Sequence, residues 1–93
     1  MADQPGALGS VDFSTYVLST ASTVQVSLGL LPDPDGTSHP VDLEAARYFI
    51  DVLAMLEQKT KGNLDETESK LIASLLYDLH IAFVDAQNKA HAK

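Results

Sequence analysis

Residues 33–44, DPDGTSHPVDLE, hold the side chains whose types and spacing come closest to a site that could do chemistry. Four oxygen-bearing side chains fall at positions 1, 3, 5 and 12 of a calcium-binding loop: Asp33, Asp35, Thr37 and Glu44. However, position 6, where such a loop needs glycine for its sharp turn, is Ser38, and position 8 is Pro40. We therefore interpret the segment as a turn that leads into the acidic start of a helix, where the helix dipole favours carboxylates.

The histidines and hydroxyls form no recognisable catalytic or metal-binding pattern. No two of His39, His80 and His91 lie four residues apart, as zinc ligands on one helix do, and the chain has no cysteine. The hydroxyl-rich stretch 14–27 lacks the Gly-x-Ser-x-Gly context of a serine nucleophile. His80 could act as a general base, but no nucleophile accompanies it, so an exposed interface histidine is the simpler interpretation. We expect no catalytic, cofactor-binding or metal-binding residue.

Composition limits the possible partners. The chain has 93 residues, enough for one domain, and its 13 acidic and 6 basic side chains give a formal net charge of −7. An acidic surface repels phosphates, so we expect binding neither to nucleic acid nor to an anionic membrane. The first residues, MADQPGALGS, lack the basic start and apolar run of a signal peptide, which leads us to expect a cytoplasmic protein.

Residues 13–32, FSTYVLSTASTVQVSLGLLP, contain no charged side chain. Twenty residues could span a membrane, but eight Ser, Thr and Gln residues interrupt the segment and no Lys or Arg flanks it. The alternation in TVQVSLGLL also fits a strand, whereas one face of a helix would hold Phe13, Tyr16, Val17, Ala21, Val24 and Leu28, with helical spacing throughout. We therefore predict a helix that is buried on two sides: its main face against the other two helices, and the side of Leu18, Ser22 and Val26 against either a partner chain or more of the same chain.

The whole chain predicts an all-α, three-helix domain. The helices should cover residues 12–28, 42–61 and 65–89, between an N-terminal tail at 1–11 and a frayed C-terminal tail at 90–93. The second and third helices should form an antiparallel hairpin that turns at Gly62 with a positive φ. Asp65 and Glu68 should form a capping box at the start of the third helix, and Asp12 and Gly29 should cap the first.

The third helix carries two apolar faces, which is more than a small domain can bury. Its core face is Leu71, Leu75, Leu79 and Phe83 with their neighbours, and a second stripe lies opposite: Ala73, Tyr77, Ile81 and Val84. Asp78 borders this stripe on one edge and His80 on the other. We expect the stripe, together with Leu18 and Val26 of the first helix, to form the interface of a homodimer or higher oligomer. Alternatively, the first helix covers the stripe within the same chain.

Four segments resemble a bacterial family catalogued as domain of unknown function 1844. They are VDFSTYVLS, LGLLPDP, DLEAARYFIDVLAMLEQKTKGNLDETE and LLYDLHIAFV, and the stretch IDVLAMLEQKTKGNL at residues 50–64 is the most specific. The resemblance runs from Val11 to about Asp85. It implies a helical protein of the bacterial cytosol, and it carries no known activity, cofactor or catalytic residue.

These observations favour a small, acidic, non-enzymatic protein that acts through self-association and contact with a further protein. The alternative is a helical module that binds a small ligand or a metal, or an accessory subunit of an enzyme. A pocket with converging polar groups would distinguish the second possibility from the first.

Overall fold

The computed structural model describes residues 11–33, 35–37 and 40–91, and this part of the chain folds into three helices without a strand. The helices are α1 (Phe13–Ser27), α2 (Leu43–Lys59) and α3 (Glu66–His91). The predicted all-α, three-helix fold is confirmed, and the strand alternative for the uncharged segment is wrong. The expected tails at residues 1–10 and 92–93 lie outside the described residues.

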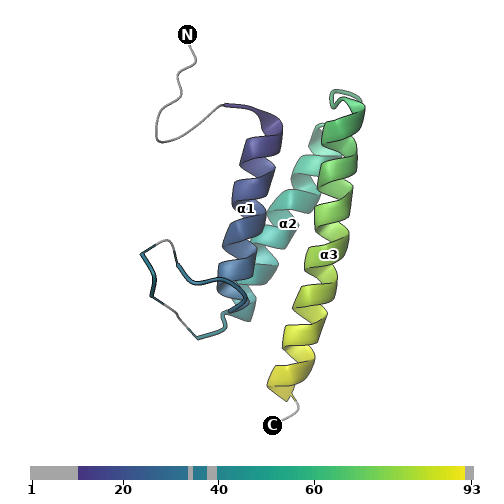
Figure 1. Cartoon of the computed structure of the whole chain (residues 1–93). Coiled ribbons are helices and arrows are strands. Elements are labelled where there is room, and N and C mark those ends of the chain that lie inside the picture. Colours follow the sequence, from purple (N-terminus) through teal and green to yellow (C-terminus); the bar gives the residue numbers. More distant parts are fainter. Residues whose placement is uncertain (1–10, 34, 38–39, 92–93) are drawn as a thin grey trace.

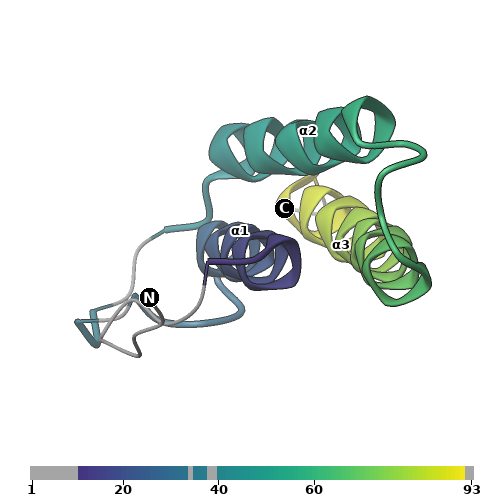
Figure 2. The ribbon, with the colours of Figure 1, turned by 90° about the horizontal axis from the view of Figure 1, so that it is seen from above.

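The three helices run down, up and down in chain order (Figure 1). Seen from above, α2 lies on one side of the molecule, with α1 and α3 next to each other beneath it (Figure 2). The α2–α3 pair is the predicted antiparallel hairpin. Because α3 has 26 residues against 15 in α1 and 17 in α2, its C-terminal end extends beyond both of the other helices (Figure 1).

All three helices contribute to one small core. The largest side chains with less than 2% exposure come from each helix: Val17 and Val24, Ile50 and Leu53, and Ile72. Burial of each such side chain contributes about 1.5–3 kcal/mol. Ten hydrophobic residues of the described chain are buried, whereas eleven large ones are exposed. The core therefore uses only part of the apolar surface that the sequence provides.

The ends of α1 are held by local hydrogen bonds. The Asp12 carboxylate accepts the backbone N–H of Thr15 at 2.7 Å, as a helix N-cap does. At the other end Gly29 has φ +80°, and its N–H donates to the carbonyl of Val26 while that of Leu30 donates to Gln25. This is a Schellman motif, in which a left-handed glycine lets the chain leave the helix.

The turn between α2 and α3 has the predicted geometry. Gly62 adopts φ +90°, a conformation that L side chains rarely adopt. The Asp65 carboxylate accepts the N–H of Glu68 at 2.8 Å, and the Glu68 carboxylate accepts the N–H of Asp65 at 3.0 Å. These reciprocal bonds are the capping box that the sequence predicts.

Three details differ from the sequence prediction. The second helix ends at Lys59 rather than Lys61, because the N–H of Lys61 donates to the carbonyl of Gln58, only three residues back, and Gly62 then adopts a left-handed conformation. The third helix continues to His91, beyond the expected end at Lys89. Tyr16 is 55% exposed, because the buried side of α1 is narrow and is centred on Val17, Ala21 and Val24.

The uncharged helix α1 is buried on one side only. Val17, Thr20, Ala21 and Val24 are its buried residues, whereas Leu18 and Ser22 are exposed. Coverage of this second side by the chain's own described residues is therefore wrong, and coverage by a partner chain stays a prediction. Across the described residues, no helix has the length and apolar content that crossing a membrane requires.

Gly62→Ala should lower the stability of the fold by about 1 kcal/mol, because a Cβ disfavours the left-handed backbone. A Cβ at this position would have no neighbouring atom within 4 Å, so the loss of stability would come from the backbone conformation rather than from a clash. Gly62→Asn is the control. Asn tolerates a positive φ better than Ala does, so this variant should lose less stability. Thermal melts followed by circular dichroism measure both; equal melting temperatures for all three proteins would contradict the turn assignment.

Asp12 should contribute to the pH dependence of stability. Hydrogen bonds from the backbone N–H and the hydroxyl of Thr15 hold the pKa of Asp12 below its usual value of 3.8. A lowered folded-state pKa means that the contribution is complete above 3.8 and is lost as the pH falls through the folded value. Asp12→Asn keeps an N-cap acceptor but cannot titrate. Melting temperatures of the wild type and the variant should be similar at pH 7, and the melting temperature of the variant should fall less on acidification. Parallel profiles of melting temperature against pH would refute this role of Asp12.

Candidate functional site

The outer face of α3 carries a row of exposed apolar side chains. Tyr77 is 69% exposed, Ile81 53% and Val84 46%, and Ala73 is also exposed. These four residues, spaced four, four and three apart, lie opposite the buried residues of α3, Ile72, Leu79 and Phe83. We call them the α3 stripe. The structure thus leaves the stripe bare, and the alternative that α1 covers it within the chain is wrong.

The two α1 residues that were grouped with the stripe differ in exposure. Leu18 is 48% exposed, and Val26 is half-buried in a groove beside the start of α2. The prediction that both join the α3 stripe in one interface stays a prediction.

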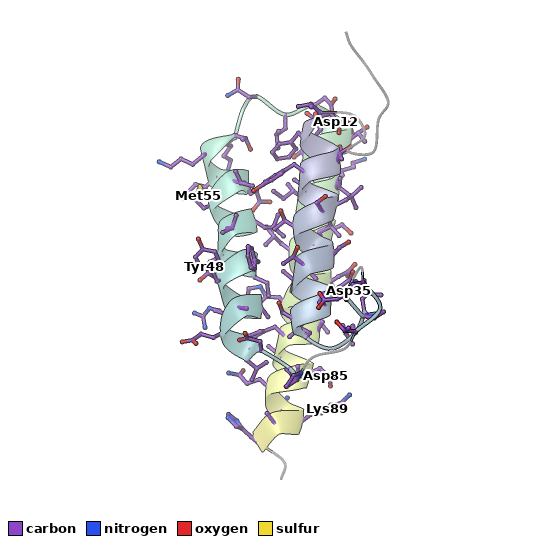
Figure 3. The ribbon with its side chains drawn as sticks, turned by 90° about the vertical axis from the view of Figure 1, so that its left-hand side faces the viewer. Asp12, Asp35, Tyr48, Met55, Asp85 and Lys89 are labelled. Atoms are coloured by element: carbon purple, nitrogen blue, oxygen red, sulfur yellow. The ribbon has the colours of Figure 1, made fainter. Side chains whose placement is uncertain are left out.

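A second apolar face, on α2, was missed by the sequence analysis. Tyr48 is 63% exposed and Met55 45%, and both lie on the side of α2 that faces away from α1 (Figure 3). The Tyr48 ring packs edge-on against that of Phe49, with centroids 5.0 Å apart. The signal was available, because Tyr48, Val52 and Met55 have the four-three spacing of one helix face.

A third apolar surface, also missed, lies at the base of the bundle. A groove of about 310 Å³ runs between the C-terminal part of α3 and the segments that flank the α1–α2 connection. Leu30 and Val41 line one side and are both more than half exposed, and Ala82 and Ala86 line the other. The Asp85–Lys89 ion pair at 3.3 Å borders it. These residues are far apart in sequence, so periodicity could not reveal the groove.

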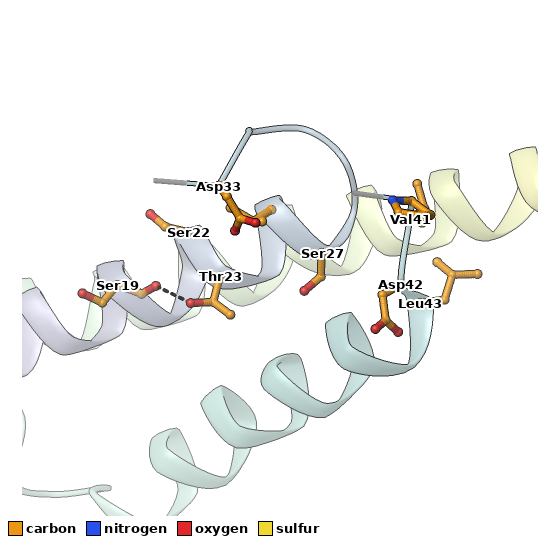
Figure 4. A pocket seen from close by; sticks show the side chains of 10 residues that line it. Ser19, Ser22, Thr23, Ser27, Asp33, Val41, Asp42 and Leu43 are labelled. Atoms are coloured by element: carbon orange, nitrogen blue, oxygen red, sulfur yellow. Dashed lines mark hydrogen bonds between the residues drawn. The ribbon is translucent and has the colours of Figure 1, made fainter. Parts of the chain in front are cut away.

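A groove of about 940 Å³ beside α1 is polar on one side. Ser19, Ser22, Thr23 and Ser27 line it from α1, with Asp33 on one side of them and Asp42 on the other (Figure 4). A row of hydroxyls and two carboxylates thus lines one concave surface. It is therefore the candidate site for a small polar ligand.

Several polar groups of this groove already hold the fold together. The Thr23 hydroxyl donates to the carbonyl of Ser19 at 3.2 Å (Figure 4). The Asp42 carboxylate caps α2 by accepting the N–H of Ala45 at 3.0 Å, and the Asp42 N–H donates to the carbonyl of Ser27 at 2.8 Å. These bonds close the α1–α2 connection, so the groove is explained in part by the path of the chain.

The acidic stretch considered as a calcium loop folds as a turn where it is described. The Asp35 carboxylate accepts both the N–H and the hydroxyl of Thr37, at 3.0 and 2.7 Å, and Gly36 has φ +88°. The Asp33 N–H donates to the carbonyl of Thr37 at 2.9 Å. Ser38 and His39 lie outside the described residues. Within the described ranges, no three His, Asp or Glu side chains come together as metal ligands would.

Comparison with known proteins identifies one family. A family model described as a domain of unknown function, DUF1844, matches residues 10–85, which include α1, α2 and most of α3. No curated protein and no solved structure matches the chain. The α3 stripe, the exposed face of α2 and the turn at Gly62 all lie within the matched residues. Because the match covers most of its length, the chain belongs to the DUF1844 family.

Proposed function

We propose that this is a small, non-enzymatic protein of the cytosol that forms a homodimer and acts through protein–protein contact. The observation that carries the proposal is the α3 stripe, whose Tyr77, Ile81 and Val84 are each about half exposed or more. Burial of one such side chain contributes about 1.5–3 kcal/mol when it is complete. Pairing two stripes across a two-fold axis would bury both sets at once.

The charge distribution is compatible with association at this face. A formal net charge of −7 on 93 residues opposes random contact between copies of the chain. The stripe itself contains no charged residue, so two copies can approach there without desolvating a charge. Contiguous exposed apolar residues rimmed by polar ones are typical of protein–protein interfaces.

The groove of about 940 Å³ between α1 and the start of α2 supports a second candidate function. Its serines could hold a small polar ligand, which would make the protein a ligand-binding module or an accessory subunit of an enzyme. We rank this second, because Thr23 and Asp42 in the groove already bond to the backbone and because the groove offers no cluster of cationic or metal-ligating groups among its described residues.

Light scattering coupled to gel filtration tests the dimer. The wild-type chain should elute at twice its own mass, and Ile81→Asp should elute at the mass of one chain, because two buried carboxylates would face each other in the pair. Ile81 is 53% exposed in the single chain, so the variant should keep its helical content and melting cooperativity.

Met55→Asp is the matched control. Met55 has similar exposure, 45%, and lies on the outer face of α2, so its variant should remain dimeric. A monomeric wild-type protein at concentrations up to the millimolar range would disprove the proposal. Dissociation by Met55→Asp but not by Ile81→Asp would move the interface to α2.

A further inference from the structure

The α3 stripe has two chemically different edges. Asp78 and Asp85 lie along one edge, and His80 lies along the other, close to the middle of the stripe. All three side chains are exposed. A helix with distinct edges restricts how it can pair with a second copy of itself, because symmetry decides which edges meet.

Most charges near the stripe are already neutralised within α3. Glu66 pairs with Lys70 at 3.2 Å, and Asp85 pairs with Lys89 at 3.3 Å. Asp78 forms no ion pair with any described residue. The uncompensated charge of this face is therefore the carboxylate of Asp78, which lies on one edge of the stripe, about midway along its length.

Two arrangements of a two-fold α3–α3 pair place this carboxylate differently. In an antiparallel pair, equal edges meet, and the axis passes near residue 79 because the stripe extends from residue 73 to residue 84. Asp78 would then lie next to the partner subunit's Asp78. In a parallel pair, opposite edges meet at the same height, so that Asp78 lies on the same side as the partner subunit's His80.

We propose that two copies of the chain pair through parallel α3 helices, an inference that rests on the proposed dimer. Like charges brought together at an interface destabilise it, whereas a carboxylate beside a histidine does not. The parallel arrangement also sets each stripe residue against its own counterpart. The spacing of four, four and three averages close to the 3.6 residues of a straight helix, so the contact can continue along the whole stripe.

Disulfide cross-linking distinguishes the two arrangements, because the chain has no cysteine of its own. Ala73→Cys and Val84→Cys are made separately in the full-length protein and oxidised under mild conditions. In a parallel pair, each variant should cross-link to itself, with most of the chain at twice its mass on a non-reducing gel. In an antiparallel pair, equal positions near the ends of the stripe are about 16 Å apart along the helix, too far for a disulfide.

A mixture of the two variants provides the reverse control. Cross-linking that occurs only between Ala73→Cys and Val84→Cys would establish the antiparallel pair and overturn the proposal. A dimeric mass by light scattering without any of these cross-links would overturn it as well. A monomeric mass for the unoxidised wild-type chain would instead disprove the dimer itself. Failure of the proposed dimer is thus distinguishable from failure of the parallel arrangement.

A charge substitution tests the same arrangement without cysteines. His80→Lys should tighten a parallel dimer about two- to tenfold at pH 7, since the new cation lies beside the partner subunit's Asp78 at two equivalent places. In an antiparallel dimer the two lysines would face each other and weaken association. Dissociation constants from sedimentation equilibrium measure the change; a weaker dimer would contradict the parallel pair.

Discussion

The fold depends on burial of one side of α1 against the other two helices. Residues 13–27 contain no charged side chain and many Ser, Thr and Val residues, so neither ion pairs nor intrinsic propensity would keep them helical alone. Val17 and Val24 are completely buried, and they share the core with Ile50 and Ile72. Asp12 and Gly29 then define where this helix begins and ends. Tertiary packing thus decides between helix and strand for a segment whose local pattern permits both.

That packing also determines which apolar surface remains outside. With α1 and α2 on its core side, α3 buries Ile72, Leu79 and Phe83, and no further element of the described chain covers the opposite face. A three-helix chain cannot bury both sides of a helix that is apolar on both sides and longer than its neighbours. The exposed stripe therefore follows from the number and length of the helices, and a second chain is the simplest way to cover it.

Local features of the fold were predictable from the sequence because their signals are local. The capping box at Asp65 and Glu68, the N-caps and the positive φ of Gly62 each depend on a few consecutive residues. The α3 stripe was predictable for a similar reason, since periodicity along one helix identifies its faces. The exposure of Tyr16 and the grooves were not predictable, because they depend on how the helices are oriented against one another.

The outer side of α1 shows how an uncharged segment can face solvent in an acidic protein. On this side the hydroxyl of Thr23 donates to the carbonyl of Ser19 one turn back, at 3.2 Å, and the buried hydroxyl of Thr20 donates in the same way to the carbonyl of Tyr16, at 3.1 Å. Hydroxyls satisfied in this way need neither a membrane nor a partner. The segment is therefore uncharged for two different reasons: its inner side is apolar core, and its outer side carries Ser and Thr hydroxyls beside exposed Tyr16 and Leu18. On α3 three large apolar side chains face outward instead, and that is the face where we propose that a second chain binds.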